Sequence, residues 1–122
     1  MKSVIRLRVL YADDDEDAGL MLSTLLNLSN IEVQTVKSVV EALRVAHSKS
    51  FDLYLLDTRF PDGSGFELCR RLREFNSSTP IVFYSGEGFE KDKAKGLAAG
   101  ANAYLVKPNC DHIAPIILRL IK

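Results

Sequence analysis

Apolar and polar positions along this chain follow two alternating patterns, and each change of pattern marks a predicted element. Short runs rich in Val, Ile, Leu and aromatic residues are typical of buried parallel strands. The segments between them repeat apolar residues every three or four positions, as amphipathic helices do. The predicted strands span residues 5–12, 31–36, 51–56, 81–84 and 103–106, and the predicted helices span residues 15–30, 38–48, 66–75, 89–99 and about 111–122.

The alternation of strand and helix predicts an α/β fold with a parallel sheet and helices on both faces. The length fits one domain over residues 1–122, without repeats or linkers. Local signals support the boundaries: Asp15 or Asp17 can cap the first helix, and Gly100 suits a left-handed helix end. The residues expected to face inward from the first three helices are Ala18, Met21, Leu22, Leu25, Leu26, Val39, Leu43, Ala46, Phe66, Cys69, Leu72 and Phe75.

Charged and hydroxyl side chains stand where the apolar runs end. Asp13 and Asp14 follow the first strand, Asp57 the third, Ser85 the fourth and Lys107 the fifth. Because parallel strands place their carboxyl ends on one edge of the sheet, where α/β proteins bind ligands, these groups should converge. Any one of them alone could serve the fold instead, since acids cap helices or turns and a strand-end lysine can extend to solvent.

Together these groups suit a cation and a phosphoryl group. Carboxylate oxygens are the ligands that Mg²⁺ prefers, and Mg²⁺ in turn accepts phosphate oxygens. Lys107 can pair with Asp57 in the empty site and with a phosphoryl group in the filled one. Ser85 offers a hydroxyl, and Asp57 is a carboxylate already ionised near neutral pH.

Composition narrows the function. The formal net charge is zero, which argues against a broad electrostatic contact with nucleic acid or an anionic membrane. No apolar stretch is long enough to span a bilayer, and no signal-peptide core precedes Asp13. Cys69 and Cys110 lack metal-ligand spacing and are predicted to be free thiols. We expect a cytoplasmic protein. His47 and His112 have no ligand partners at suitable spacing.

The motifs in this order resemble the receiver domain of bacterial two-component response regulators over essentially the whole chain. They are Asp13-Asp14, Asp57, Pro61-Asp62-Gly63-Ser64-Gly65, Ser85 and Lys107-Pro108. The resemblance implies a flavodoxin-like, doubly wound (βα)5 fold, whose five-stranded parallel sheet has the order 2-1-3-4-5. It also implies a phosphoacceptor domain and not an enzyme, apart from self-phosphorylation and autodephosphorylation.

The resemblance implies a role for each matching residue. Asp57 would accept the phosphoryl group from the phosphohistidine of a sensor histidine kinase or a histidine phosphotransfer protein. Asp13, Asp14, Asp57 and the backbone carbonyl of Arg59 would bind Mg²⁺. Such chemistry needs positioning and charge neutralisation more than acid–base machinery.

Other matching residues would sense the phosphoryl group. Ser85 would donate to one of its oxygens and Lys107 would pair with another, with a cis bond between Lys107 and Pro108. Tyr104 matches the aromatic that turns inward on activation, although it can also be a plain core aromatic. The expected result is a population shift at the surface formed by the fourth helix, fifth strand and fifth helix.

The sequence departs from the common family pattern at several positions. Arg59 is bulky and charged, and we expect it to shield the acyl phosphate from water or to pair with Glu87 or another nearby acid. Arg59 and Glu87 are therefore expected to tune the lifetime of the acyl phosphate. Asn109 replaces an apolar residue, and Pro115 falls near the first turn of the last helix. These two changes disfavour a standard dimer, leaving a monomer or a weak phosphorylation-dependent dimer.

Two other classes of function compete with this one. A haloacid-dehalogenase-like phosphatase also uses a strand-end Asp with Mg²⁺, but it would need an acid where Arg59 stands, and a cap domain. A degenerate receiver would be a phosphorylation-independent interaction module, which the intact acidic set argues against. The output domain or downstream protein stays open, as does whether the chain stands alone or belongs to a longer regulator or hybrid kinase.

Overall fold

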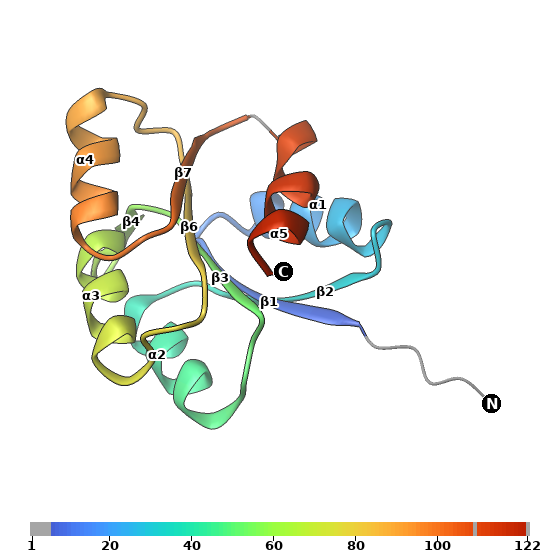
Figure 1. The fold of residues 1–122 in the computed structure, drawn as a ribbon, viewed down its shortest axis with the longest axis horizontal. Coiled ribbons are helices and arrows are strands. Elements are labelled where there is room, and N and C mark those ends of the chain that lie inside the picture. Colours follow the sequence, from blue (N-terminus) through green and yellow to red (C-terminus); the bar gives the residue numbers. More distant parts are fainter. Residues whose placement is uncertain (1–5, 109, 122) are drawn as a thin grey trace.

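A parallel sheet forms the centre of the molecule, as the computed structural model shows for the residues it describes, 6–108 and 110–121. Its strands are β1 (Leu7–Ala12), β2 (Ile31–Val36), β3 (Leu53–Leu56), β6 (Ile81–Ser85) and β7 (Ala103–Val106). They lie in the order β2-β1-β3-β6-β7, all parallel (Figure 1). With only these strands counted, the order is 2-1-3-4-5, which confirms the predicted fold. The predicted start of β1 at residue 5 lies outside the described residues.

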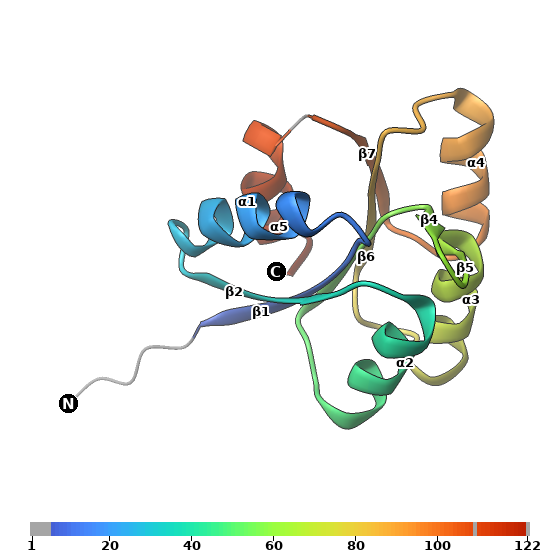
Figure 2. The same cartoon turned by 180° about the vertical axis from the view of Figure 1, so that it is seen from behind.

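Helices cover both faces of the sheet, as predicted. They are α1 (Glu16–Asn27), α2 (Val39–Ser48), α3 (Gly65–Phe75), α4 (Glu90–Ala98) and α5 (Ile113–Ile121), with a 3-10 turn (Cys110–His112) before α5. Helices α1 and α5 lie on one side, and α2, α3 and α4 lie on the other (Figures 1 and 2). None of the helices within the described ranges is both long and apolar enough to cross a bilayer.

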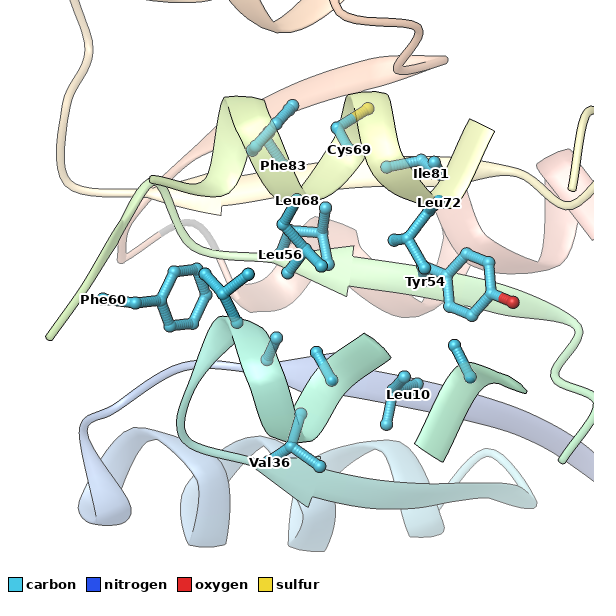
Figure 3. Packing of buried hydrophobic residues seen from close by; sticks show 14 of the residues in the cluster. Leu10, Val36, Tyr54, Leu56, Phe60, Leu68, Cys69, Leu72, Ile81 and Phe83 are labelled. Carbon is cyan, nitrogen blue, oxygen red and sulfur yellow. The ribbon is translucent and has the colours of Figure 1, made fainter. Parts of the chain in front are cut away.

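Alternate residues of each strand feed two separate apolar cores. Leu10, Tyr54 and Phe83 point to the side of α2 and α3, where they pack with residues such as Leu68 and Leu72 (Figure 3). Their strand neighbours point to the side of α1 and α5; these are Val9, Tyr11, Leu53, Leu55, Val82 and Tyr84. This alternation buries both faces of the central strands and explains why β3 and β6 are apolar almost throughout, whereas the edge strand β2 carries exposed Glu32 and Thr35.

Two of the residues predicted to face inward do not. Met21 is 64% exposed and Phe75 is 41% exposed. Helix α1 contacts the sheet through Leu22 and Leu26, and a neighbouring position is turned by about 100° on a helix of 3.6 residues per turn. Met21 therefore lies at the flank. Phe75 stacks on His47 at the rim, with ring centroids 3.9 Å apart.

The predicted loop after β3 is in fact a short antiparallel hairpin of β4 (Arg59–Phe60) and β5 (Gly63–Ser64). Its turn is fixed to α2, because the Asp62 carboxylate accepts hydrogen bonds from the backbone N–H groups of Val39 and Val40. These bonds lower the pKa of Asp62. Sequence patterns missed the hairpin because two-residue strands have no periodicity to detect.

Gly65, at the start of α3, lies directly against the strand that carries Asp57. A Cβ atom at position 65 would lie 1.9 Å from the backbone oxygen of Asp57. Since no side chain tolerates such a distance, the close approach of α3 to the end of β3 requires glycine here.

At the opposite edge of the sheet, Arg73 of α3 joins several connections. Its guanidinium donates to the backbone oxygens of Gly100, Asn76 and Thr79, and to the side-chain oxygen of Asn102. Gly100 has a φ of 116°, which confirms it as the left-handed end of α4. One planar cation thus holds the α3–β6 and α4–β7 connections together.

Candidate functional site

The polar residues predicted at the strand ends do meet at one edge of the sheet. Asp13 follows β1, Asp57 follows β3, Ser85 ends β6 and Lys107 follows β7. The register is tied across the edge: the Asp57 N–H donates to the Ala12 carbonyl, and the Lys107 N–H donates to the Ser85 carbonyl. The Lys107–Pro108 bond is cis, as the resemblance implied.

Three carboxylates form the acidic part of the site. One oxygen from each of Asp13, Asp14 and Asp57 lies within 4.8 Å of the others. Asp13 is buried, Asp57 is half-buried and Asp14 is exposed. Within residues 6–108 and 110–121, this is the one group of three or more His, Cys, Asp or Glu side chains close enough to share a metal ion.

Lys107 neutralises part of this charge. Its ammonium lies 2.6 Å from Asp13 Oδ2 and 3.4 Å from Asp57 Oδ2, so the expected pairing with Asp57 is present but the shorter contact is with Asp13. Burial lowers the pKa of Lys107, but the two carboxylates outweigh it and the net shift is upward. Burial, and then the charge of Asp13, raise the pKa of Asp57 against the lowering effects of the Thr58 N–H and Lys107.

A tyrosine that the sequence analysis did not single out also contacts Asp13. Tyr11 of β1 is fully buried, and its hydroxyl donates to Asp13 Oδ2 over 2.6 Å. Burial, together with the hydrogen bond and charge of Asp13, raises the pKa of Tyr11 well above its usual value, so the hydroxyl remains a donor. The available signal was a hydroxyl two positions before Asp13, on the same side of the strand.

A hydroxyl pair lies beside Asp57. Thr58 and Ser85 are both buried, and their hydroxyl oxygens are 2.7 Å apart. The Ser85 oxygen also accepts the N–H of Glu87. Thr58 was not predicted as a site residue. Its position next to Asp57, at the end of a strand paired with β6, was the signal that could have identified it.

Glu87 connects this pair to the surface and to Tyr104. Its carboxylate forms an ion pair with Arg59, one of the two alternatives expected for that arginine. Its backbone oxygen accepts a 2.5 Å hydrogen bond from the Tyr104 hydroxyl. The loop after β6 is therefore bonded to Arg59 of β4 and to Tyr104 of β7.

The Tyr104 ring lies between the sheet and α4. Its centroid is 5.6 Å from that of Phe83. Gly96 makes room for both rings, because a Cβ atom there would lie 2.9 Å from each. Burial raises the pKa of Tyr104. In this structure the predicted switch residue thus points to the site loop.

A pocket of about 400 Å³ opens beside Asp57. It is lined by Asp57, Thr58, Arg59, Ser85, Gly86 and Glu87. Gly86 has open space where a Cβ atom would lie. The pocket therefore gives a small polar group access to the carboxylate of Asp57, and the Thr58 and Ser85 hydroxyls and the exposed Arg59 side chain are part of its lining.

The donor set fits Mg²⁺. It offers carboxylate oxygens, with no sulfur or imidazole among its members, which is the set expected for a hard divalent cation that keeps several waters. The other ligand candidates lie elsewhere: His47 stacks on Phe75, and Cys69 is a free, buried thiol whose pKa burial raises to about 11. Asn109 and the Cys110 side chain fall outside the described part.

The sequence profile of the family described as "Response regulator receiver domain" matches residues 9–117 of this chain. The chain belongs to the response regulator receiver domain family. Its fold agrees, since the receiver domain superposes on a putative response regulator from Chloroflexus aurantiacus J-10-fl with a TM-score of 0.91, at 28% sequence identity over 96% of this chain and 98% of that one.

The chain is also similar to parts of two longer curated proteins. It is 36% identical over 101 residues to the nisin biosynthesis regulatory protein NisR of Lactococcus lactis subsp. lactis, covering 83% of this chain and 44% of NisR. It is 38% identical over 103 residues to the sensor protein EvgS of Escherichia coli (strain K12), covering 84% of this chain and 9% of EvgS. The chain thus spans less than half the length of these relatives.

Proposed function

We propose that this receiver domain accepts a phosphoryl group on Asp57 from the phosphohistidine of a sensor histidine kinase or a histidine phosphotransfer protein. The observation that carries the proposal is the pocket beside Asp57, which that carboxylate and the hydroxyls of Thr58 and Ser85 line. The Lys107 ammonium lies 3.4 Å from Asp57 Oδ2. A transferred phosphoryl group needs these parts: a nucleophile, donors for its oxygens and a cation for its charge.

The transfer forms one bond and breaks one. An Asp57 carboxylate oxygen attacks phosphorus, the bond between phosphorus and the histidine nitrogen breaks, and the nitrogen keeps the electron pair. Lys107 moves from Asp57 to a phosphoryl oxygen, and the Ser85 and Thr58 hydroxyls donate to others. Hydrolysis by water later returns the Asp57 carboxylate and inorganic phosphate.

Asp13, Asp14, Asp57 and the backbone carbonyl of Arg59 are the proposed ligands of Mg²⁺. Bound there, Mg²⁺ would offset the negative charge that the acids and the phosphoryl group bring together. The protein's own contribution is to hold one oxygen of each of the three carboxylates within 4.8 Å of the others and to keep Asp57 partly shielded from water.

The proposed signal is carried by the loop between β6 and α4. A phosphoryl oxygen that accepts from Ser85 competes with the Thr58–Ser85 bond and draws Ser85 toward Asp57. Glu87 follows, because it is bonded to Ser85, and it carries the partner of the Tyr104 hydroxyl with it. The surface of α4, β7 and α5 then shifts between two populations that a partner can distinguish.

Arg59 and Glu87 are the proposed determinants of acyl phosphate lifetime. Their ion pair stands at the mouth of the pocket, where attacking water must enter. A phosphoryl group carries up to two negative charges, so it attracts Arg59 and repels Glu87. A phosphoryl group on Asp57 therefore favours movement of Arg59 toward it and of the Glu87 carboxylate away from it.

The partners follow from the same chemistry. We propose a cytoplasmic domain that meets its phosphodonor and an output domain or downstream protein, without direct contact to nucleic acid or membrane, as a monomer or a weak phosphorylation-dependent dimer. One relative is named a regulatory protein and the other a sensor protein, so both a longer regulator and a hybrid kinase are consistent with the match.

The direct test is incubation of the protein with Mg²⁺ and acetyl phosphate, followed by intact mass and a phosphate-release assay. The expected result is one phosphoryl adduct that disappears in Asp57→Asn and persists in the control Asp17→Asn, which changes an exposed acid outside the cluster. Rapid multiple turnover would instead indicate a phosphatase, and absence of an adduct would indicate a degenerate receiver; either result overturns the proposal.

A further inference from the structure

The carboxylate of Asp13 is held by three donors. Its Oδ1 accepts the backbone N–H of Asp15 over 2.9 Å. Its Oδ2 accepts both the Tyr11 hydroxyl and the Lys107 ammonium, each over 2.6 Å. A carboxylate has about four acceptor positions. With three of them occupied, about one acceptor position remains, on Oδ1. Asp13 therefore meets any further ligand in an orientation that these donors determine.

The Tyr11 hydroxyl stands out from the core around it. Tyr11 belongs to the apolar cluster under α1 and α5, whose other members are aliphatic except Tyr84, with its ring centroid 6.4 Å from that of Tyr11. A phenylalanine would fill the same space, and a buried hydroxyl is costly unless it is bonded. Asp13 is the partner that satisfies it. The hydroxyl is thus placed for Asp13 and contributes nothing further to the apolar packing.

The two donors on Oδ2 differ in their freedom to move. Lys107 has a flexible stem and is itself shared with Asp57. In the proposed function it must turn toward the phosphoryl group. Tyr11 is fixed by the sheet and by its own burial. When Lys107 leaves, Asp13 Oδ2 loses one of its two donors. A buried acceptor without any donor is unfavourable, and the Tyr11 hydroxyl is the donor that stays.

We propose that Tyr11 is a positioning residue of the magnesium site: its hydroxyl fixes the Asp13 carboxylate toward the cation and keeps Oδ2 bonded while Lys107 transfers to the phosphoryl group. This inference rests on the proposed function. Donors behind a metal-binding carboxylate orient it, and their loss weakens metal binding although they never touch the ion.

The test replaces Tyr11→Phe, with Tyr54→Phe as the matched control. Tyr54 is also a buried tyrosine of the sheet, but its oxygen accepts from Asn76 in the core on the other face. Titration calorimetry of the unphosphorylated proteins measures Mg²⁺ binding directly. We expect the Kd for Mg²⁺ to rise about tenfold in Tyr11→Phe and to stay within about twofold of wild type in Tyr54→Phe.

Phosphorylation by acetyl phosphate gives a second readout. At limiting Mg²⁺ the Tyr11→Phe protein should react more slowly than wild type, and saturating Mg²⁺ should restore the rate. In an Asp13→Asn background the same substitution should no longer change the Kd, because Tyr11 acts through Asp13. A purely structural role would lower thermal stability in both tyrosine variants and leave the Kd of both unchanged, which would overturn the inference.

The experiment separates this inference from the proposed function. If wild type binds Mg²⁺ and is phosphorylated while Tyr11→Phe matches it, only the role of Tyr11 fails. If wild type neither binds Mg²⁺ nor forms an acyl phosphate, the proposed function fails and the role of Tyr11 with it.

Discussion

Replacing Asp57 by Asn should stabilise the fold at neutral pH when divalent cations are absent. Asp57 is 15% exposed and carries a charge that its surroundings disfavour. Asn keeps the shape of the side chain and can still accept the Thr58 N–H, which bonds Asp57 Oδ1 over 2.7 Å. The substitution therefore removes the charge with little loss of packing.

The size of the effect follows from the distances. Asp13 lies within 4.8 Å of Asp57 and Lys107 lies 3.4 Å from it. At an effective dielectric constant of about 20, the repulsion is about 3.5 kcal/mol and the attraction is about 5 kcal/mol, and exposed Asp14 adds about 1 kcal/mol of repulsion. These contributions nearly cancel, which leaves the cost of burying the charge.

That burial cost is several kcal/mol for a fully buried ion, and partial exposure and the Thr58 bond reduce it, so we expect a gain of about 1–2 kcal/mol. For a domain of this length the gain corresponds to a rise in Tm of about 4–8 °C. Urea and thermal unfolding in the presence of a chelator measure both values.

The gain should depend on pH. The folded state raises the pKa of Asp57 above the value of about 3.9 that an unfolded chain shows, so between these two values the folded protein binds more protons. The free energy of unfolding of wild type therefore falls as pH rises through this window. That of Asp57→Asn does not fall for this reason, because Asn has no proton to release. The difference between them should be small near pH 4 and reach its full size above the folded pKa.

Asp52→Asn is the control. Asp52 accepts the Arg8 N–H and is not part of the acidic cluster, so removing its charge relieves no repulsion from Asp13 or Asp14. An Asp57→Asn protein that unfolds at a lower urea concentration than wild type at pH 7, or a difference that does not change with pH, would refute the reasoning.

Other substitutions test the remaining parts. Arg59→Ala should shorten the acyl phosphate lifetime several-fold, measured by phosphate release, because it removes the ion pair with Glu87 at the pocket mouth; equal lifetimes would contradict this. Gly96→Ala should cost about 1–3 kcal/mol in urea unfolding, since its Cβ would lie 2.9 Å from the Tyr104 ring, although alanine is the better helix former by about 1 kcal/mol; a net gain in stability would show that the ring moves freely. Arg73→Met should destabilise by about 2 kcal/mol, because partly buried acceptors lose a charged donor, while the rate of phosphorylation stays at the wild-type value; a slower rate would show that the far edge of the sheet affects the site.

Much of the fold could be predicted because the signals were strong and local. Strands apolar on both faces indicated a sheet buried on both sides, and their order set the edge where Asp13, Asp57, Ser85 and Lys107 meet.

Two predicted helix-end signals are confirmed: the Asp15 side chain accepts the N–H groups of Asp17 and Ala18, and Gly100 ends α4, whereas α1 stops at Asn27, before the predicted residue 30. The Ser38-Val39-Val40-Glu41 sequence predicts a capping box at the start of α2. Ser38 accepts the Glu41 N–H as this pattern requires, but the Glu41 carboxylate accepts from the backbone N–H of Lys37, one residue earlier than a capping box requires.

The parts that could not be predicted depend on contacts between distant segments. Thr58 becomes a site residue only because β3 and β6 are neighbours, which brings its hydroxyl to Ser85. Periodicity assigned Met21 to the core, but helix packing selected Leu22 and Leu26 and left it exposed. The contact of Lys107 with Asp13 was likewise hidden, since sequence order does not reveal which of two acids a lysine prefers.

Gly65 takes part in no reaction, but it restricts which residues the site can accommodate next to Asp57. Because any Cβ atom there would meet the backbone oxygen of Asp57, a larger residue must push α3 away or displace the nucleophile. In a library that samples all amino acids at every position, selection for signalling should therefore deplete substitutions at position 65 as thoroughly as those at Asp57. Gly86, where a Cβ atom would meet open space, should tolerate small residues. Mutational tolerance would then separate the two glycines, which look equivalent in the sequence.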